Sequence, residues 1–177
     1  KFPRAVDVAA QVPHCAVRTY VMGDRGTNNE KATADDVAQM SAIVKEGVAA
    51  GALGFTTSRT QLHTTRQEQP MPGTYADEDE LLGIGKAIGE LGKGIFGVVS
   101  DWDNWEVEMD WMKRLSIENH CQVNFVLFFR EEKDWPRVLA QLAYVREAKK
   151  EGAQLIPHVG ARPVNLLLSW DGTVHPF

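Results

Sequence analysis

Polar or ionisable side chains come directly after several apolar runs of the sequence, at Ser58 and Arg59, at Ser100 and Asp101, and at His158. Hydroxyl, guanidinium, carboxylate and imidazole groups bind substrates and transfer protons in enzymes. In folds that alternate strands with helices, the carboxyl ends of the strands converge on one face of the domain. We therefore expect these side chains to contribute to one substrate pocket.

Two more candidates lie in loops. The longest connection, residues 59–76, has no helical or strand period and contains His63. Connections of more than about 12 residues are usually binding loops or disordered segments. His63 is thus a candidate for contact with a ligand, with a solvated loop histidine as the alternative. Arg162 shares its edge with His158, for which the alternative is a buried core histidine.

Asp24 and Asp101 each follow the predicted end of a strand. Either carboxylate is a candidate general base, or it caps the segment that follows. Capping fits Asp101 better, because this residue opens a polar turn before a predicted helix.

Local motifs of known chemistry are missing from the sequence. It contains no His-x-His, His-Glu-x-x-His or Gly-x-Ser-x-Gly, and its cysteines have no metal-binding spacing. Any metal site would have to be assembled from distant strand ends. The nearest approach to a dinucleotide-binding motif, Gly83 and Gly85 with Gly89, falls inside a predicted helix, where small residues favour helix packing.

Hydrophobic patterning predicts five strands and four helices in alternation. The expected strands are residues 16–22, 53–58, 95–100, 123–129 and 155–159. Thr33 and Asp36 have the spacing of a capping box for a helix that ends at Gly51. The other expected helices are residues 77–92, 104–119 and 134–151.

Short strands joined by single helices imply a parallel α/β sheet. Such a sheet is either doubly wound or closed into a barrel, and without a dinucleotide motif the barrel is favoured. Eight β/α units take about 250 residues, so five strands cannot close one. The sequence predicts one domain, residues 1–177, that forms part of a (β/α)8 TIM-type barrel. Its open sheet edges are expected sites of pairing, including homo-oligomerisation.

Composition excludes several classes of partner. The chain has 177 residues with 19 Lys plus Arg against 24 Asp plus Glu, a formal net charge of −5. Because the basic residues are scattered, binding to nucleic acid is not expected. Membrane insertion is not expected either, since no apolar run approaches about 18 residues. Cys15 and Cys121 lie far apart, which favours a reducing compartment, the cytoplasm.

Several sequence blocks occur in the order found in a known enzyme family. They are Val12-Pro13-His14, Val21-Met22-Gly23-Asp24-Arg25-Gly26, the run from Ala49 to Thr60, Pro72-Gly73-Thr74 and Ala161-Arg162-Pro163-Val164. With these blocks the chain resembles the N-acyl-D-amino-acid deacylase (D-aminoacylase-like) branch of the amidohydrolase superfamily.

This resemblance implies a β/α barrel that hydrolyses a C–N amide bond of N-acyl-D-amino acids with zinc or another divalent metal in the full-length protein. It places the family's metal-binding and catalytic residues on barrel strands outside this chain, so no catalytic residue and no metal are expected here. It also places Arg59 and His63 beside the substrate pocket, and gives His14 a structural role. The isolated chain is expected to be inactive.

One departure from the family pattern concerns the metal. D-aminoacylases carry ligand histidines at two strand ends where this chain has Val99-Ser100 and Leu127-Phe128. Apolar side chains cannot ligate a metal, which implies a reduced metal site or another ligand set. The alternatives are a cyclic-amide hydrolase and a non-catalytic barrel fragment that acts as a binding or assembly module.

Overall fold

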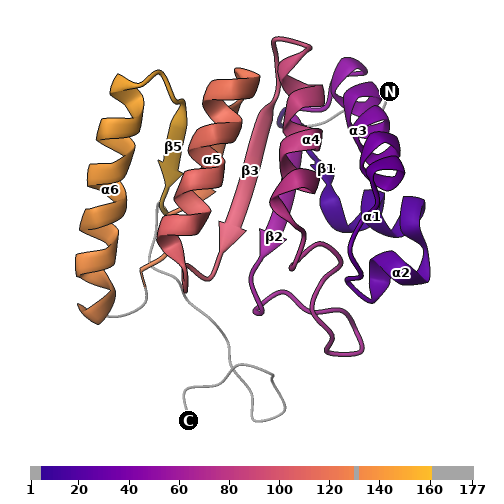
Figure 1. Ribbon diagram of the computed structural model, residues 1–177, viewed down its shortest axis with the longest axis horizontal. Coiled ribbons are helices and arrows are strands. Elements are labelled where there is room, and N and C mark those ends of the chain that lie inside the picture. Colours follow the sequence, from indigo (N-terminus) through magenta and orange to yellow (C-terminus); the bar gives the residue numbers. More distant parts are fainter. Residues whose placement is uncertain (1–4, 130–131, 161–177) are drawn as a thin grey trace.

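A single parallel sheet organises the chain, in which the computed structural model describes residues 5–129 and 132–160 (Figure 1). The strands pair in sequential order, and each is parallel to its neighbours. They are β1 (Val12–Pro13), β2 (Gly54–Arg59), β3 (Ile95–Ser100), β4 (Gln122–Val126) and β5 (Leu155–His158).

Helices connect each strand to the next. The connections contain α1 (His14–Met22), α2 (Asp24–Thr27), α3 (Ala34–Ala49), α4 (Glu78–Gly89), α5 (Trp105–Asn119), the 3-10 turn η1 (Glu132–Asp134) and α6 (Trp135–Lys150). Sequential strand order with helical crossovers is the order of a β/α barrel, whereas a doubly wound sheet reverses its order at a switch point. The predicted partial TIM-type barrel is confirmed. No helix within the described ranges is long and apolar enough to cross a membrane.

The main core lies between one face of the sheet and the helices, with α4 and α5 in front of the sheet in Figure 1. Phe96 and Val98 of β3 are buried, whereas Gly97 and Val99, which alternate with them, are only partly buried. This alternation follows from the period of two along a strand. The opposite face of the sheet carries the partly buried residues and corresponds to the inner face of a barrel.

Local signals explain where α3 begins. The Thr33 hydroxyl accepts a hydrogen bond from the Asp36 N–H, and the Asp36 carboxylate accepts one from the Thr33 N–H, so the predicted capping box is confirmed. The Arg25 guanidinium also donates to Asp36 at 2.8 Å. That hydrogen bond and those from Thr33 lower the pKa of Asp36 to about 2.

The predicted strand at residues 16–22 is wrong, because this segment forms α1. Its β-branched and aromatic residues favour a strand. Yet His14, Val17, Arg18 and Met22 are buried at spacings of one helical face. The true first strand, β1, has only two residues. The predicted strand edge at residues 23–25 therefore follows a helix, and Asp24 lies exposed in the first turn of α2, away from the sheet.

The glycines of α4 serve helix packing, as predicted. A Cβ at Gly83 would lie 2.5 Å from Val37 of α3, and one at Gly89 would lie 1.7 Å from the carbonyl oxygen of Asn119 at the end of α5. Only glycine permits backbone contact this close. The resemblance of this segment to a phosphate-binding motif is therefore accidental.

Candidate functional site

A hollow of about 160 Å³ lies where β2 and β3 end. It brings together three of the predicted pocket residues, Arg59, Ser100 and Asp101, with Tyr75 and Glu108 also in its wall. Arg59 and Ser100 are the last residues of their strands. The structure therefore brings these three polar groups together at the ends of β2 and β3.

Asp101 anchors the long loop that follows β2. Its carboxylate accepts hydrogen bonds from the Thr60 hydroxyl and, at 2.8 Å, from the Gln61 N–H. Helix α5 begins with Asn104 as its N-cap residue, so the interpretation of Asp101 as a cap is wrong. The side chain instead fixes the first residues of the loop against β3.

Arg59 is held on the helical side of the sheet. Its Nε donates to both carboxylate oxygens of Glu108 in α5, at 3.0 and 2.9 Å, and its Nη1 donates to the Ala76 carbonyl at 2.8 Å. The guanidinium also lies over the Trp111 ring, 5.8 Å from the ring centroid. Arg59 thus fastens the end of the loop to α5, as Asp101 fastens its beginning.

His63 occupies a fixed position in this loop although its side chain is exposed. Its Nδ1 lies 2.8 Å from the hydroxyl of Ser58, and its carbonyl oxygen accepts from the Met71 N–H at 3.2 Å. Ser58 alternates with the buried Thr57 and so belongs to the inner face of the sheet. The imidazole is therefore oriented at the carboxyl end of β2.

His158 lies apart from this hollow, at the end of β5. Its side chain is exposed, so the alternative of a buried core histidine is wrong. Its carbonyl accepts a hydrogen bond from the Leu127 N–H at 2.8 Å, which continues the β4–β5 pairing. Arg162, the remaining predicted pocket residue, lies outside the described residues.

A buried polar network beneath the rim was not recognised from the sequence. His14 Nε2 lies 2.7 Å from a carboxylate oxygen of Glu80, and its Nδ1 lies 2.8 Å from the Thr57 hydroxyl. The guanidinium of Arg18 donates to the other oxygen of Glu80 and to the Glu30 carbonyl. His14 and Arg18 are four residues apart, one turn of α1, and that spacing was the available signal.

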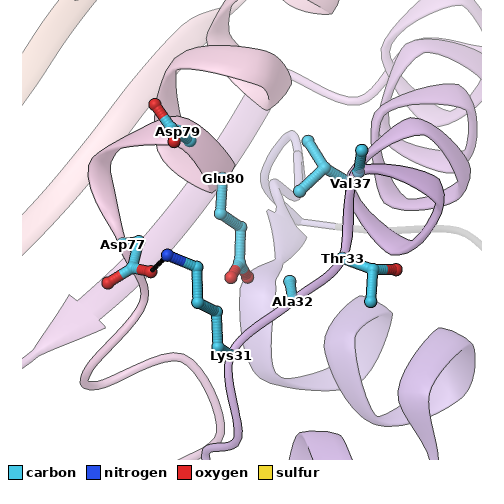
Figure 2. A pocket seen from close by; sticks show the side chains of 8 residues that line it. Lys31, Ala32, Thr33, Val37, Asp77, Asp79 and Glu80 are labelled. Atoms are coloured by element: carbon cyan, nitrogen blue, oxygen red, sulfur yellow. Dashed lines mark ion pairs between the residues drawn. The ribbon is translucent and has the colours of Figure 1, made fainter.

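One member of the network, Glu80, lines a cavity of about 330 Å³ between the starts of α3 and α4. Figure 2 shows Glu80 extending from α4 toward Ala32, with Lys31 and Asp77 beside it. The Lys31 ammonium pairs with Asp77 at 2.8 Å, and both side chains are largely exposed. This surface pair contributes little, whereas the buried groups determine the electrostatics.

Burial determines the direction of the pKa shift at His14, and hydrogen bonding determines it at Glu80. Desolvation lowers the pKa of His14, although Glu80 acts in the opposite direction. Burial alone would raise the pKa of Glu80, but hydrogen bonds from His14 and Arg18 bring it below its ordinary value. A carboxylate only accepts hydrogen bonds, so the neutral His14 carries its proton on Nε2 and accepts from Thr57.

Acidification is expected to destabilise the chain in two steps. Below the ordinary histidine pKa of 6.5, the unfolded chain binds a proton that folded His14 resists, so the free energy of unfolding falls by up to about 1.4 kcal/mol per pH unit. As pH falls further, below 4.5, the contribution of ionised Glu80 is also lost. Urea unfolding between pH 7.5 and 3 measures both steps.

Two histidine variants separate the first step from other titrations. His14→Gln should be less stable at pH 7 but should lose the slope that begins near pH 6.5, since it has no imidazole to protonate. His63→Gln, at an exposed position, should keep that slope. Equal slopes in the two variants would show that His14 does not cause it.

Comparison with known proteins identifies the family to which this chain belongs. The model of the amidohydrolase family matches residues 3–168. The chain belongs to the amidohydrolase family. The membership of the amidohydrolase superfamily that the sequence blocks implied is thereby confirmed. A search of curated proteins finds no match to this amidohydrolase chain.

Solved structures that share this fold include an N-acyl-D-glutamate deacylase and a D-aminoacylase. N-acyl-D-glutamate deacylase from Bordetella bronchiseptica, complexed with zinc and a phosphonate inhibitor, is 21% identical with a TM-score of 0.71. A structure of D-aminoacylase, described as defining a novel subset of amidohydrolases, is 20% identical with a TM-score of 0.68. Each alignment covers 89% of this amidohydrolase chain, which spans 31% of the matched structure.

The described residues of this amidohydrolase do not form a metal site. Across residues 5–129 and 132–160, no group of three or more His, Cys, Asp or Glu side chains could hold a metal ion. Val99 and Leu127 stand on neighbouring strand ends, and neither has a donor atom. The chemistry that these residues offer is hydrogen bonding and loop positioning.

Proposed function

We propose that the full-length protein hydrolyses the amide C–N bond of N-acyl amino acids, with preference for the D configuration. The family match over residues 3–168 carries this proposal. It is supported by the fold that the chain shares with N-acyl-D-glutamate deacylase and D-aminoacylase. In this proposal the chain contributes five barrel strands and the loops at their carboxyl ends.

A divalent metal, zinc in the first instance, belongs to the proposed full-length enzyme. The deacylase from Bordetella bronchiseptica contains zinc. Because the described residues of this chain offer no metal-binding group, we assign the ligands to parts of the protein outside them. Their identity decides how many metals the enzyme binds.

We propose that this chain forms one side of the substrate pocket. The pocket residues are Arg59, His63, Ser100, Asp101, His158 and Arg162. His63, oriented by Ser58, presents an imidazole at the end of β2 that suits a carbonyl or carboxylate of the substrate. Arg59 and Asp101 act by holding the two ends of the loop that carries His63.

Activity of the zinc-loaded full-length protein tests this function. N-acetyl-D-amino acids should be hydrolysed faster than their L isomers, with amine release as the measured product. Hydrolysis of a cyclic amide but of no N-acyl amino acid would favour the cyclic-amide alternative. No hydrolysis, together with concentration-dependent association of the isolated chain in sedimentation, would favour an assembly module that pairs through its edge strands β1 and β5.

Loop anchoring predicts the effect of one substitution in the proposed enzyme. Asp101→Ala removes the acceptor for Thr60 and Gln61, so KM should rise about tenfold as the loop loses its fixed start. Asp103→Ala, at an exposed position in the same turn, should leave KM unchanged. Equal KM values for the two variants would contradict a positioning role for Asp101.

We further propose a cytoplasmic location. Both cysteines, Cys15 and Cys121, are free thiols in the structure. Free thiols are typical of proteins from reducing compartments.

A further inference from the structure

A second hollow lies between α2 and the loop that follows β2, and the proposed hydrolysis does not use it. Its volume is about 500 Å³, within the range of small-molecule sites. Thr27, Asn28 and Asn29 form one wall, at the end of α2, and Gln67, Gln69 and Tyr75 belong to the loop. We call this hollow the amide groove.

Asn29 holds the two walls of the amide groove together. Its side-chain oxygen accepts from the Gly73 N–H at 2.8 Å, and its Nδ2 donates to the Pro70 carbonyl at 3.3 Å. Asn29 itself has a left-handed backbone with φ 56°, which asparagine tolerates better than most residues. These hydrogen bonds hold the two walls in place before a ligand binds, which reduces the conformational entropy lost on binding.

Backbone hydrogen bonds within the loop stiffen the second wall. The Thr65 N–H donates to Gln69 at 2.8 Å, and the Glu68 N–H donates back to Thr65 at 3.0 Å. The Thr65 hydroxyl accepts from the N–H groups of Gln67 and Gln69. Since these backbone groups are already paired, this wall offers a ligand mainly side-chain amides, hydroxyls and an aromatic ring.

The composition of the groove excludes most classes of ligand. Among the residues that the structure describes, no Asp, Glu, Lys, Arg or His lines it. A charged ligand would therefore lose its hydration without gaining an opposite charge. An apolar ligand would leave the amides of Asn28 and Gln67 without partners. An extended peptide added as a strand needs free backbone groups, which this wall has committed to its own turn.

A neutral carbohydrate satisfies all of these conditions. Sugar hydroxyls both donate and accept, as do the side-chain amides of Asn28, Gln67 and Gln69. The ring of Tyr75, which is 55% exposed, offers an apolar face for the C–H face of a pyranose. We propose that the amide groove binds a neutral oligosaccharide.

Saturation-transfer NMR and calorimetry on the full-length protein test this proposal with maltotriose, cellotriose, triacetylchitotriose and, as a charged control, trigalacturonate. At least one neutral trisaccharide should bind, whereas trigalacturonate should not. Tyr75→Ala should weaken that binding about tenfold, whereas Tyr75→Phe, which keeps the ring, should weaken it less than about threefold. Tyr20→Ala removes another exposed tyrosine that does not line the groove and should change nothing.

Several results would overturn the proposal. One is the absence of binding by all three neutral trisaccharides, and another is equal binding by trigalacturonate. Binding that survives both Tyr75→Ala and Gln67→Ala would place the sugar elsewhere on the protein. Because binding is measured without turnover, these results are independent of whether the protein hydrolyses N-acyl amino acids.

Discussion

Replacing Glu80 with glutamine is expected to lower the free energy of unfolding by about 3 to 5 kcal/mol. Arg18 and His14 are almost completely buried, and Glu80 supplies the only negative charge bonded to them among the described residues. Without that charge, the guanidinium stays desolvated and uncompensated. Urea denaturation at pH 7, followed by circular dichroism, measures the change.

Glu78→Gln is the matched control for this substitution. Glu78 also lies in the first turn of α4 and also pairs with an arginine, Arg114 at 2.9 Å, but both side chains are substantially exposed. Its loss should cost less than about 1 kcal/mol. The double variant Arg18→Met, Glu80→Gln should regain part of the lost stability, because it removes the unpaired charge. Equal midpoints for Glu78→Gln and Glu80→Gln would contradict the assigned role of the network.

Elements with strong local signals were predictable from the sequence. The strand Ile95–Ser100 has the predicted bounds, and α5 ends at Asn119 as predicted. In both segments the apolar period agrees with the burial in the fold, and glycines or polar turns mark the ends. Sequential order followed from the same information, because one helix between parallel strands leaves few topologies.

The first β/α unit was not predictable in this way. Strand β1 has two residues and one neighbouring strand, so no period can appear in it. The next segment contains Val17, Thr19 and Val21, whose strand preference is overridden by packing against α3 and β2. Tertiary contacts therefore decided the structure where the local signals were weak or misleading.

In the candidate site, too, some features were predictable from the sequence and others were not. Strand ends are visible in a sequence, so Ser100 and Asp101 could be placed at the rim. The partners of these groups could not be found, because pairing depends on the fold: Arg59 meets Glu108 across 49 residues, and His14 meets Glu80 across 66. The structure thus shows which rim residues hold the loop, a role that spacing alone does not reveal.

Close contact between β2 and β3 predicts a second large effect, at Gly54. This residue has φ 150°, and an added Cβ would lie 1.9 Å from the carbonyl oxygen of Ile95 in the neighbouring strand. A backbone atom of a central strand cannot move aside cheaply. Gly54→Ala should therefore lower the free energy of unfolding by about 4 kcal/mol or more, the sum of backbone strain and overpacking.

Gly51→Ala separates these two contributions, because Gly51 also has positive φ, 117°, but nothing lies within 4 Å of its Cβ position. Its cost should be that of backbone conformation alone, about 1 to 2 kcal/mol. The difference between the two variants in urea denaturation then measures the contact between β2 and β3. Equal losses would mean that the strands separate enough to admit a methyl group, so that pairing at this end of the sheet would be looser than the register of Gly54 with Ile95 indicates.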